Sequence, residues 1–146
     1  MKTFATLSLL IFTLIFTSCD ETKRVIDVAG SVQLTGSYTV SALNGKKISA
    51  KTNPTFSLSA LDNSFQANTG CNSIFGNYSL DLYAISFSDL AVTAKECPEE
   101  NVMSVEREFL DALNNTGSYG LENNMLTLYS KTDRSVLLKA TKDKKN

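Results

Sequence analysis

Turn residues divide the chain from Leu34 onward into short segments of strand-forming residues, and this spacing is the strongest constraint on the fold. Residues 37–43 alternate in polarity and run into Asn44-Gly45, the dipeptide most typical of a two-residue hairpin. A return strand is therefore expected over residues 46–50. The same pattern predicts further strands over residues 55–61, 64–68, 73–80, 84–92, 118–121, 125–129 and 136–140, with turns at Asp62-Asn63, Asn123-Asn124 and around Thr132-Asp133.

One segment departs from this pattern. Residues 99–114 place Val102, Phe109 and Leu113 at helical spacing, with Val105 or Glu106 completing the stripe. Acidic residues at the start favour the positive end of a helix dipole, and residues 114–117 are able to end the helix with a left-handed Asn or Gly. Roughly eight strands and one helix predict a mainly β (α+β) fold, a small antiparallel β-barrel or roll with the helix covering one end.

The amino terminus has the features of an export signal. Lys2 is followed by a mostly apolar run over residues 4–16, which is shorter than the about 20 residues of a membrane span. Phe16-Thr17-Ser18-Cys19 resembles a lipobox, so we expect residues 1–18 to be removed as a lipoprotein signal peptide and Cys19 to be lipidated. The alternatives are an ordinary secretory signal followed by an unrelated cysteine, and a retained membrane helix.

This interpretation divides the chain into four parts. Residues 19–33 are expected to be the lipidated Cys and a flexible tether, residues 34–141 the folded domain, and residues 142–146 a charged tail. Asp20-Glu21 resembles the export signals of surface lipoproteins of Bacteroidota, although a merely solvated linker is the alternative. The expected location is the cell envelope, with the domain outside the cytoplasm and the lipid in the outer membrane or cell surface rather than the inner membrane.

Composition excludes several classes of function. All 15 acidic residues but only 13 of the 14 basic residues follow Cys19, so the mature chain has a net charge of about −2 and no nucleic-acid partner is expected. The chain contains no histidine, which rules out Ser-His-Asp triads, Cys-His dyads and His-based zinc sites. An enzyme would have to use carboxylates, Lys, Tyr or Cys. We expect no enzyme activity, no catalytic residues, no metal and no cofactor.

Residues 69–78, with the sequence TGCNSIFGNY, are the most distinctive segment. They resemble the signature of the META domain, the family that includes the heat-shock protein HslJ. The resemblance extends in order over residues 34–140, through Leu43-Asn44-Gly45, residues 90–98, residues 106–113 and Leu126-Thr127-Leu128. Tyr38 stands where the family often has Trp, and Glu96 stands where a small or apolar residue is usual; both departures bear on local core packing. The resemblance implies a non-enzymatic envelope protein.

The motif also has a physical interpretation of its own. Gly70 and Asn72 tolerate positive φ, so Gly70-Cys71-Asn72 predicts a sharp corner between strands, and Gly76 predicts a bulge or a second corner. Once Cys19 carries lipid, Cys71 and Cys97 are the remaining thiols, and an oxidising compartment favours a disulfide between them. Reduced structural thiols and a redox pair are the alternatives.

Three further groups have both a functional and a structural interpretation. Glu96, Glu99 and Glu100 offer oxygen ligands for calcium or form a solvated cluster at the helix start. Asp89 shares one side of a strand with Phe87 and Ile85. Its functional interpretation is an inward catalytic or ligand-binding carboxylate, and its structural interpretation is a strand-end residue paired to backbone. The five tyrosines line a ligand cavity or belong to an ordinary core; they are Tyr38, Tyr78, Tyr83, Tyr119 and Tyr129.

These observations favour a monomeric, lipid-anchored binding module that is stress-associated or maintains the envelope. Its one indicated partner is the membrane, through the amino-terminal lipid; its protein or small-molecule ligand is not specified by the sequence. The alternative is a carrier of a small apolar ligand inside the barrel. A hydrolase would need two facing carboxylates in a cleft, and the linear spacing shows no such pair.

Overall fold

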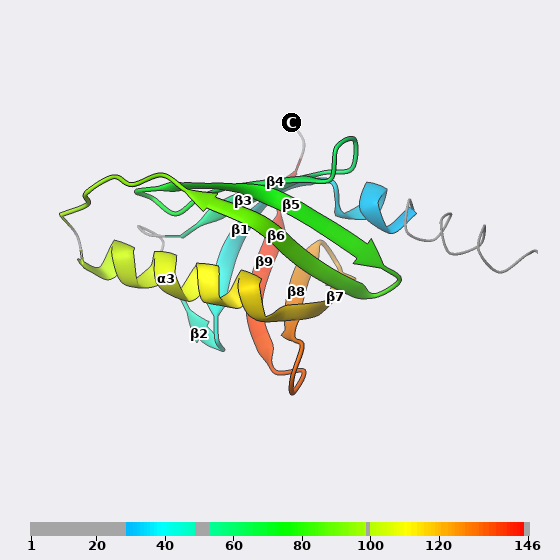
Figure 1. Ribbon diagram of the computed structural model, residues 1–146. Coiled ribbons are helices and arrows are strands. Elements are labelled where there is room, and N and C mark those ends of the chain that lie inside the picture. Colours follow the sequence, from blue (N-terminus) through cyan, green and yellow to red (C-terminus); the bar gives the residue numbers. More distant parts are fainter. Residues whose placement is uncertain (1–28, 49–52, 99, 145–146) are drawn as a thin grey trace, which may run out of the picture.

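The computed structural model describes residues 29–48, 53–98 and 100–144 (Figure 1). These residues contain nine strands and a helix of 16 residues. Residues 29–34 are also helical. The named elements are β1 (Gly36–Leu43), β2 (Lys46–Lys47), β3 (Thr55–Ser59), β4 (Ser64–Asn68), β5 (Ser73–Asp81), β6 (Ala84–Val92), α3 (Glu100–Asn115), β7 (Thr116–Glu122), β8 (Met125–Ser130) and β9 (Val136–Lys142).

The strands close into an antiparallel barrel of eight strands, which confirms the predicted fold class. The order is β1-β3-β4-β5-β6-β7-β8-β9, and β9 pairs back to β1. The short strand β2 pairs only with the last two residues of β1. Strand pairing is weakest between β6 and β7, where Ala84 and Ser118 are the single pair of residues in register. Helix α3 connects β6 to β7 and packs against β1, β6, β8 and β9 (Figure 1).

The hairpin turns confirm the local signals in the sequence. Asn44 and Gly45 have φ angles of 47° and 76°, and Asn123 and Asn124 have φ angles of 49° and 64°. Two consecutive left-handed residues are what a two-residue hairpin turn of the I′ type requires. Asn63 also has a positive φ, 53°, in the turn between β3 and β4. The return strand expected over residues 46–50 is shorter, because β2 ends at Lys47 and residues 49 and 50 lie outside the described residues.

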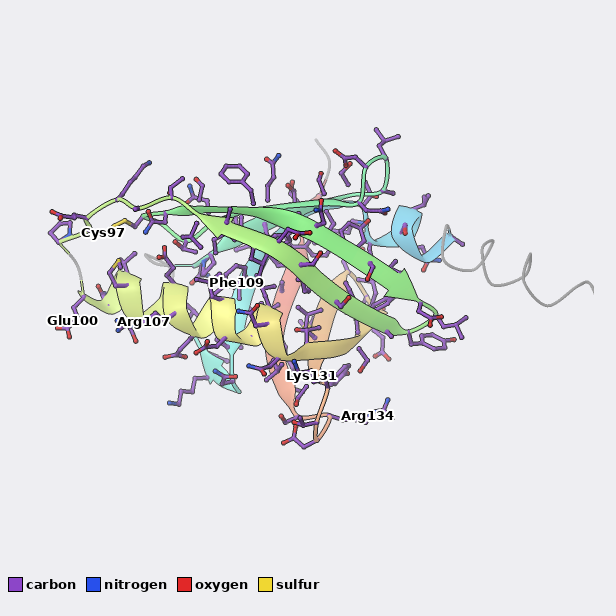
Figure 2. All side chains as sticks on the ribbon, viewed as in Figure 1. Cys97, Glu100, Arg107, Phe109, Lys131 and Arg134 are labelled. Atoms are coloured by element: carbon purple, nitrogen blue, oxygen red, sulfur yellow. A yellow bond between two sulfur atoms is a disulfide. The ribbon has the colours of Figure 1, made fainter. Side chains whose placement is uncertain are left out.

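Aromatic side chains fill the barrel interior. The ring of Phe56 stacks on Tyr38 with centroids 5.0 Å apart and lies 5.8 Å from Phe65. Phe109 of α3 approaches both phenylalanines, at 6.2 Å and 6.4 Å, and is fully buried. Figure 2 shows Phe109 on the side of α3 that faces the sheet, whereas Arg107 points outward. The helix therefore completes the core that the strands enclose.

The end of α3 differs from the expectation. Residues 114–117 include no residue with positive φ, so the left-handed terminus is not formed. β7 begins at Thr116, directly after the helix. Neighbouring groups donate hydrogen bonds to the last carbonyls of the helix instead. Thr116 Oγ1 donates to the carbonyl of Ala112 at 2.7 Å, and the backbone N–H of Lys131 donates to that of Asn115 at 3.0 Å. These bonds satisfy the helix end without a glycine cap.

The ordered domain extends beyond both expected ends. Leu34 is fully buried, and the preceding helical residues 29–33 belong to the segment expected to be a tether. At the other end β9 includes Lys142, and the N–H of Asp143 donates to the carbonyl of Ser37 at 2.8 Å, although both were expected in the charged tail. The signal peptide over residues 1–18, Cys19 and the rest of the tether lie outside the described residues. Among residues 29–48, 53–98 and 100–144, no helix has the length and apolar character to cross a membrane.

Candidate functional site

Gly70-Cys71-Asn72 forms a tight corner between β4 and β5, as the sequence predicts. Gly70 has a φ of 94°, a conformation that a side chain would strain. The N–H of Gly70 donates to Oδ1 of Asn68 at 2.8 Å, and the N–H of Thr69 donates to the carbonyl of Asn72 at 3.0 Å. Asn72 does not have positive φ; its side chain turns inward and is almost fully buried.

The buried side chain of Asn72 joins three parts of the chain. Its Nδ2 donates to Oε1 of Glu106 on α3 at 3.0 Å. Its Oδ1 accepts from the hydroxyl of Thr93 at 3.0 Å and from the N–H of Lys95 at 2.9 Å, both just after β6. Glu106 Oε2 lies 2.5 Å from the hydroxyl of Thr69, which completes the network. The corner, the end of β6 and the helix are thus held together by buried polar groups that bond one another.

The sequence left either Val105 or Glu106 on the apolar stripe of the helix and did not predict this role for Glu106. The sequence contained a signal for it, since a carboxylate on the same helix face as Val102 and Phe109 would be buried. A buried carboxylate needs hydrogen-bond donors. The donors lie 34 and 37 residues away along the chain, in Asn72 and Thr69. No local pattern joins positions so far apart.

Cys71 and Cys97 are joined by a disulfide, with their Cα atoms 6.2 Å apart. That separation lies within the ordinary range for a disulfide. The bond connects the corner to the segment just before α3, beside the hydrogen bonds of Asn72. Two crosslinks, one covalent and one polar, therefore fix the same junction between β5, β6 and α3.

Gly76 and Asp89 face each other across an irregularity in the β5–β6 ladder. The pairing register shifts between Phe75 and Asn77, opposite Asp89, which has a φ of 54°. The extra residue lies on β6, where Asp89 and Leu90 oppose Gly76, so the bulge is in the strand opposite Gly76 and not at Gly76 itself. Asp89 is exposed, and its Oδ2 accepts from Asn77 at 3.3 Å and from Ser88 at 3.1 Å. The alternative of an inward carboxylate at Asp89 is therefore wrong, because the bulge turns the residue out of the barrel.

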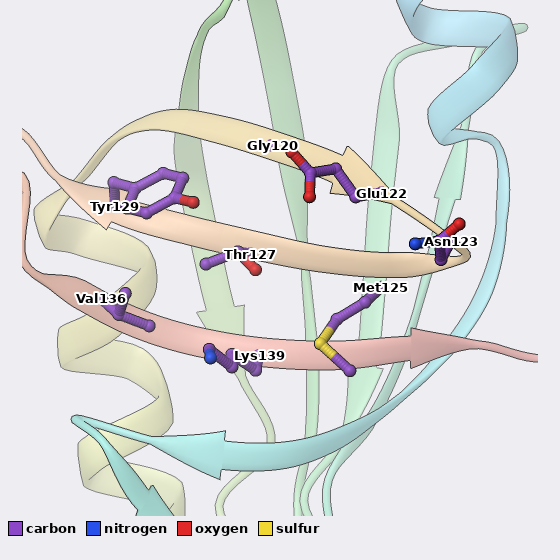
Figure 3. A pocket seen from close by; sticks show the side chains of 8 residues that line it. All are labelled: Gly120, Glu122, Asn123, Met125, Thr127, Tyr129, Val136 and Lys139. Atoms are coloured by element: carbon purple, nitrogen blue, oxygen red, sulfur yellow. The ribbon is translucent and has the colours of Figure 1, made fainter.

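A groove of about 380 Å³ lies on the outer face of β7, β8 and β9 (Figure 3). The ring of Tyr129 stands close to Gly120 on the neighbouring strand, where an added Cβ would meet the ring at 3.5 Å. Figure 3 shows aromatic, apolar and charged side chains presented together from three strands, the lining residues being Gly120, Glu122, Asn123, Met125, Thr127, Tyr129, Val136 and Lys139. None of these except Tyr129 was a candidate from the sequence.

The profile of the META domain family matches residues 32–143, which is most of the chain. The chain belongs to the META domain family. The corner with Cys71, the disulfide and the helix with Glu106 all lie within the matched residues, so the site is part of the META domain itself.

Solved structures support the fold of this META domain. A protein from Burkholderia xenovorans, studied by NMR, has a TM-score of 0.64 and 22% identity over 81% of this chain and 89% of its own. A second NMR structure has a TM-score of 0.58 and 20% identity, covering 74% of this chain and 89% of its own. A duf4847 family protein from Bacteroides vulgatus has a TM-score of 0.56 and 17% identity, over 81% and 99%. These identities show a shared fold only. No curated protein matches the sequence.

The remaining candidates are not brought together. Glu96 and Glu100 are exposed and Glu99 lies outside the described residues; the residues that the structure describes contain no cluster of three acidic, Cys or His groups able to hold a metal. Of the five tyrosines, Tyr38 and Tyr78 are buried in the META core and Tyr119 is partly buried against it, whereas Tyr83 is exposed and Tyr129 lies on the outer face. The hydroxyl of Tyr38 donates to the carbonyl of Leu34 at 2.8 Å. The tyrosines therefore do not line one cavity.

Proposed function

We propose that this META-domain protein is a lipid-anchored component of the bacterial cell envelope and a non-enzymatic binding module in envelope maintenance or stress. Residues 1–18 direct export, and Cys19 carries the lipid in the outer membrane or at the cell surface. The disulfide between Cys71 and Cys97 supports a location outside the cytoplasm, since such bonds persist in oxidising compartments.

The observation that carries the proposal is the contrast between the interior and the outer face of the barrel. The aromatic side chains of Tyr38, Phe56, Phe65 and Phe109 occupy the volume that the carrier hypothesis needs open. The outer groove instead presents Tyr129 with apolar and charged neighbours to solvent. Such a combination is typical of surfaces that bind a partner.

The first experiment is the intact mass of the protein isolated from its native membrane, with and without reduction and thiol alkylation. A diacyl or triacyl increment on a chain starting at Cys19, with Cys71 and Cys97 alkylated only after reduction, is the expected result. A lipid-free chain that begins elsewhere would overturn the anchor, and thiols that react without reduction would contradict the oxidised state.

The second experiment tests the role and the groove together. A deletion strain is exposed to detergent stress on its envelope and complemented with the wild type, Cys19→Ala, Tyr129→Ala or Gln66→Ala. Gln66 is exposed on another outer face of the barrel, so Gln66→Ala is the control. We expect rescue by the wild type and the control, and impaired rescue by the other two. A deletion without any stress phenotype would contradict the role, and full rescue by Tyr129→Ala would exclude the groove.

A further inference from the structure

One end of the barrel is unusually apolar for a set of turns. Val32, Leu61, Leu82 and Tyr83 are 63%, 100%, 38% and 78% exposed. They come from the helical residues 29–34, the turn between β3 and β4, and the turn between β5 and β6. Isolated exposed apolar residues are common, but four on one helical segment and two adjoining turns form a patch that marks an interaction surface.

Contacts hold these three segments side by side. Val32 and Leu61 line one shallow hollow with Leu80, the residue just before the β5–β6 turn. A Cβ at Gly30 would lie 3.1 Å from the hydroxyl of Tyr119, which donates to the carbonyl of Leu82 at 3.4 Å. Figure 1 shows the helical segment, in blue, beside the tips of both turns. We call the surface of Val32, Leu61, Leu82 and Tyr83 the apolar end.

The β5–β6 turn has an apolar residue at a left-handed backbone position, which favours Gly or Asn. Leu82 has a φ of 57°, and the left-handed positions of the other hairpin turns are occupied by polar residues or glycine, namely Asn44, Gly45, Asn63, Asn123, Asn124 and Arg134. Asn is better tolerated than Leu in that conformation. The apolar side chain at this tip is therefore not explained by turn geometry.

We propose that the apolar end rests on the phospholipid bilayer that holds the lipid of Cys19, an inference that depends on the proposed lipid anchor. The described chain begins at Ala29 within this same end, and residues 19–28 number only ten. Ten residues span at most about 36 Å, so the lipid keeps the apolar end near the membrane. Leucine side chains bury in the acyl boundary, and the amphipathic ring of Tyr83 suits the headgroup level.

The attraction is apolar rather than electrostatic. The segments 29–34, 60–64 and 80–84 contain Asp62 and Asp81 but no Lys or Arg. The cation Lys142 bonds to the first of these segments, since its ammonium donates to the carbonyl of Gln33 at 2.6 Å. Docking should therefore occur on zwitterionic lipid and should not require anionic lipid. It also orients the domain: β5 runs nine residues from near Cys71 to the β5–β6 turn, so the disulfide lies about 30 Å from the docked end (Figure 2).

The absence of tryptophan from the chain allows a direct test. The lipidated protein, whose chain starts at Cys19, is placed in phosphatidylcholine vesicles with Tyr83→Trp as a single probe. The matched control is Phe75→Trp, at a 46% exposed strand position. Brominated phosphatidylcholine should quench the fluorescence of the first variant several-fold more than that of the second. Adding Leu61→Ser to Tyr83→Trp should reduce the quenching to about the control level.

Equal quenching at positions 83 and 75 would overturn the proposal, as would quenching that requires anionic phospholipid. Intact mass is measured on the same samples. Acylated protein with equal quenching contradicts the docked orientation alone, whereas protein without an acyl group on Cys19 contradicts the anchor on which it depends.

Discussion

The side-chain amide of Asn72 donates to the carboxylate of Glu106 at 3.0 Å, and this bond joins the Gly70-Cys71-Asn72 corner to helix α3. Both side chains are almost fully buried. The hydroxyl of Thr93 and the N–H of Lys95 hold the other side of the same amide. Asn72 is thus a structural link between three segments.

Glu106→Ala should lower the free energy of unfolding by about 1–3 kcal/mol, because the buried Nδ2 of Asn72 loses its acceptor. The hydroxyl of Thr69 can turn to the carbonyl of Asn72, 3.1 Å away, so it adds little to the loss. Glu106→Gln keeps one acceptor and should lose less. Urea denaturation measures both, with the half-buried Glu108→Ala as control, and equal losses at positions 106 and 108 would contradict the role of the bond.

Gly76→Ala should destabilise the domain by about 1–3 kcal/mol, because overpacking shifts the backbone of the bulge. The new Cβ would lie 2.8 Å from both Leu90 Cδ2 and the carbonyl oxygen of Ser88. Gly120→Ala is the matched control in another strand, where the nearest atom, in Tyr129, is at an ordinary 3.5 Å. Thermal and urea unfolding should show Gly120→Ala within about 0.5 kcal/mol of the wild type or slightly more stable. Equal losses from the two substitutions would exclude steric crowding at Gly76.

The features predicted from the sequence are those encoded locally. Asn44-Gly45 and Asn123-Asn124 take the backbone angles that their residue types favour, and the strands between such turns follow. The pairing of Glu106 with Asn72 depends on packing across 34 residues and has no local signature. The end of α3 was mispredicted for a similar reason, because the N–H of Lys131, from the turn after β8, supplies the cap that a glycine was expected to provide.

Stability should fall with pH in the alkaline range because of Tyr38. Burial raises the pKa of Tyr38 from 10.0 to about 12, so between these values the unfolded chain releases a proton that the folded chain keeps. The free energy of unfolding therefore falls as pH rises from 10 to about 12, while below pH 10 this group contributes no pH dependence. Urea midpoints measured from pH 9 to about pH 12 test the slope.

Tyr38→Phe should make this slope shallower, leaving the part due to Tyr78, whose pKa burial also raises. It should also cost about 1 kcal/mol at neutral pH, since the carbonyl of Leu34 loses its hydrogen bond. Tyr129→Phe on the outer face controls for the loss of a hydroxyl. A slope identical to that of the wild type would show that Tyr38 does not carry the effect.

Loss of the disulfide should lower the free energy of unfolding by about 3.5 kcal/mol, the chain-entropy value for the sequence separation of 26 between Cys71 and Cys97. The variant Cys71→Ser/Cys97→Ser and the reduced wild type should agree, because both release the same loop. Urea unfolding with and without reductant compares them. A double variant that still responds to reductant would show that another thiol is responsible.

The disulfide and the bond between Asn72 and Glu106 should be coupled, since both fix the corner against the segments around α3. Without the disulfide the corner can relax and hydrate Asn72, so Glu106→Ala should then cost less than it does in the oxidised protein. The double-mutant cycle of Glu106→Ala with Cys71→Ser/Cys97→Ser should give a coupling of about 0.5 kcal/mol or more. Additivity within about 0.3 kcal/mol would mean that the two crosslinks hold the junction independently. The same cycle with Glu108→Ala, which lies on the same helix, should be additive and thereby assigns the coupling to the corner.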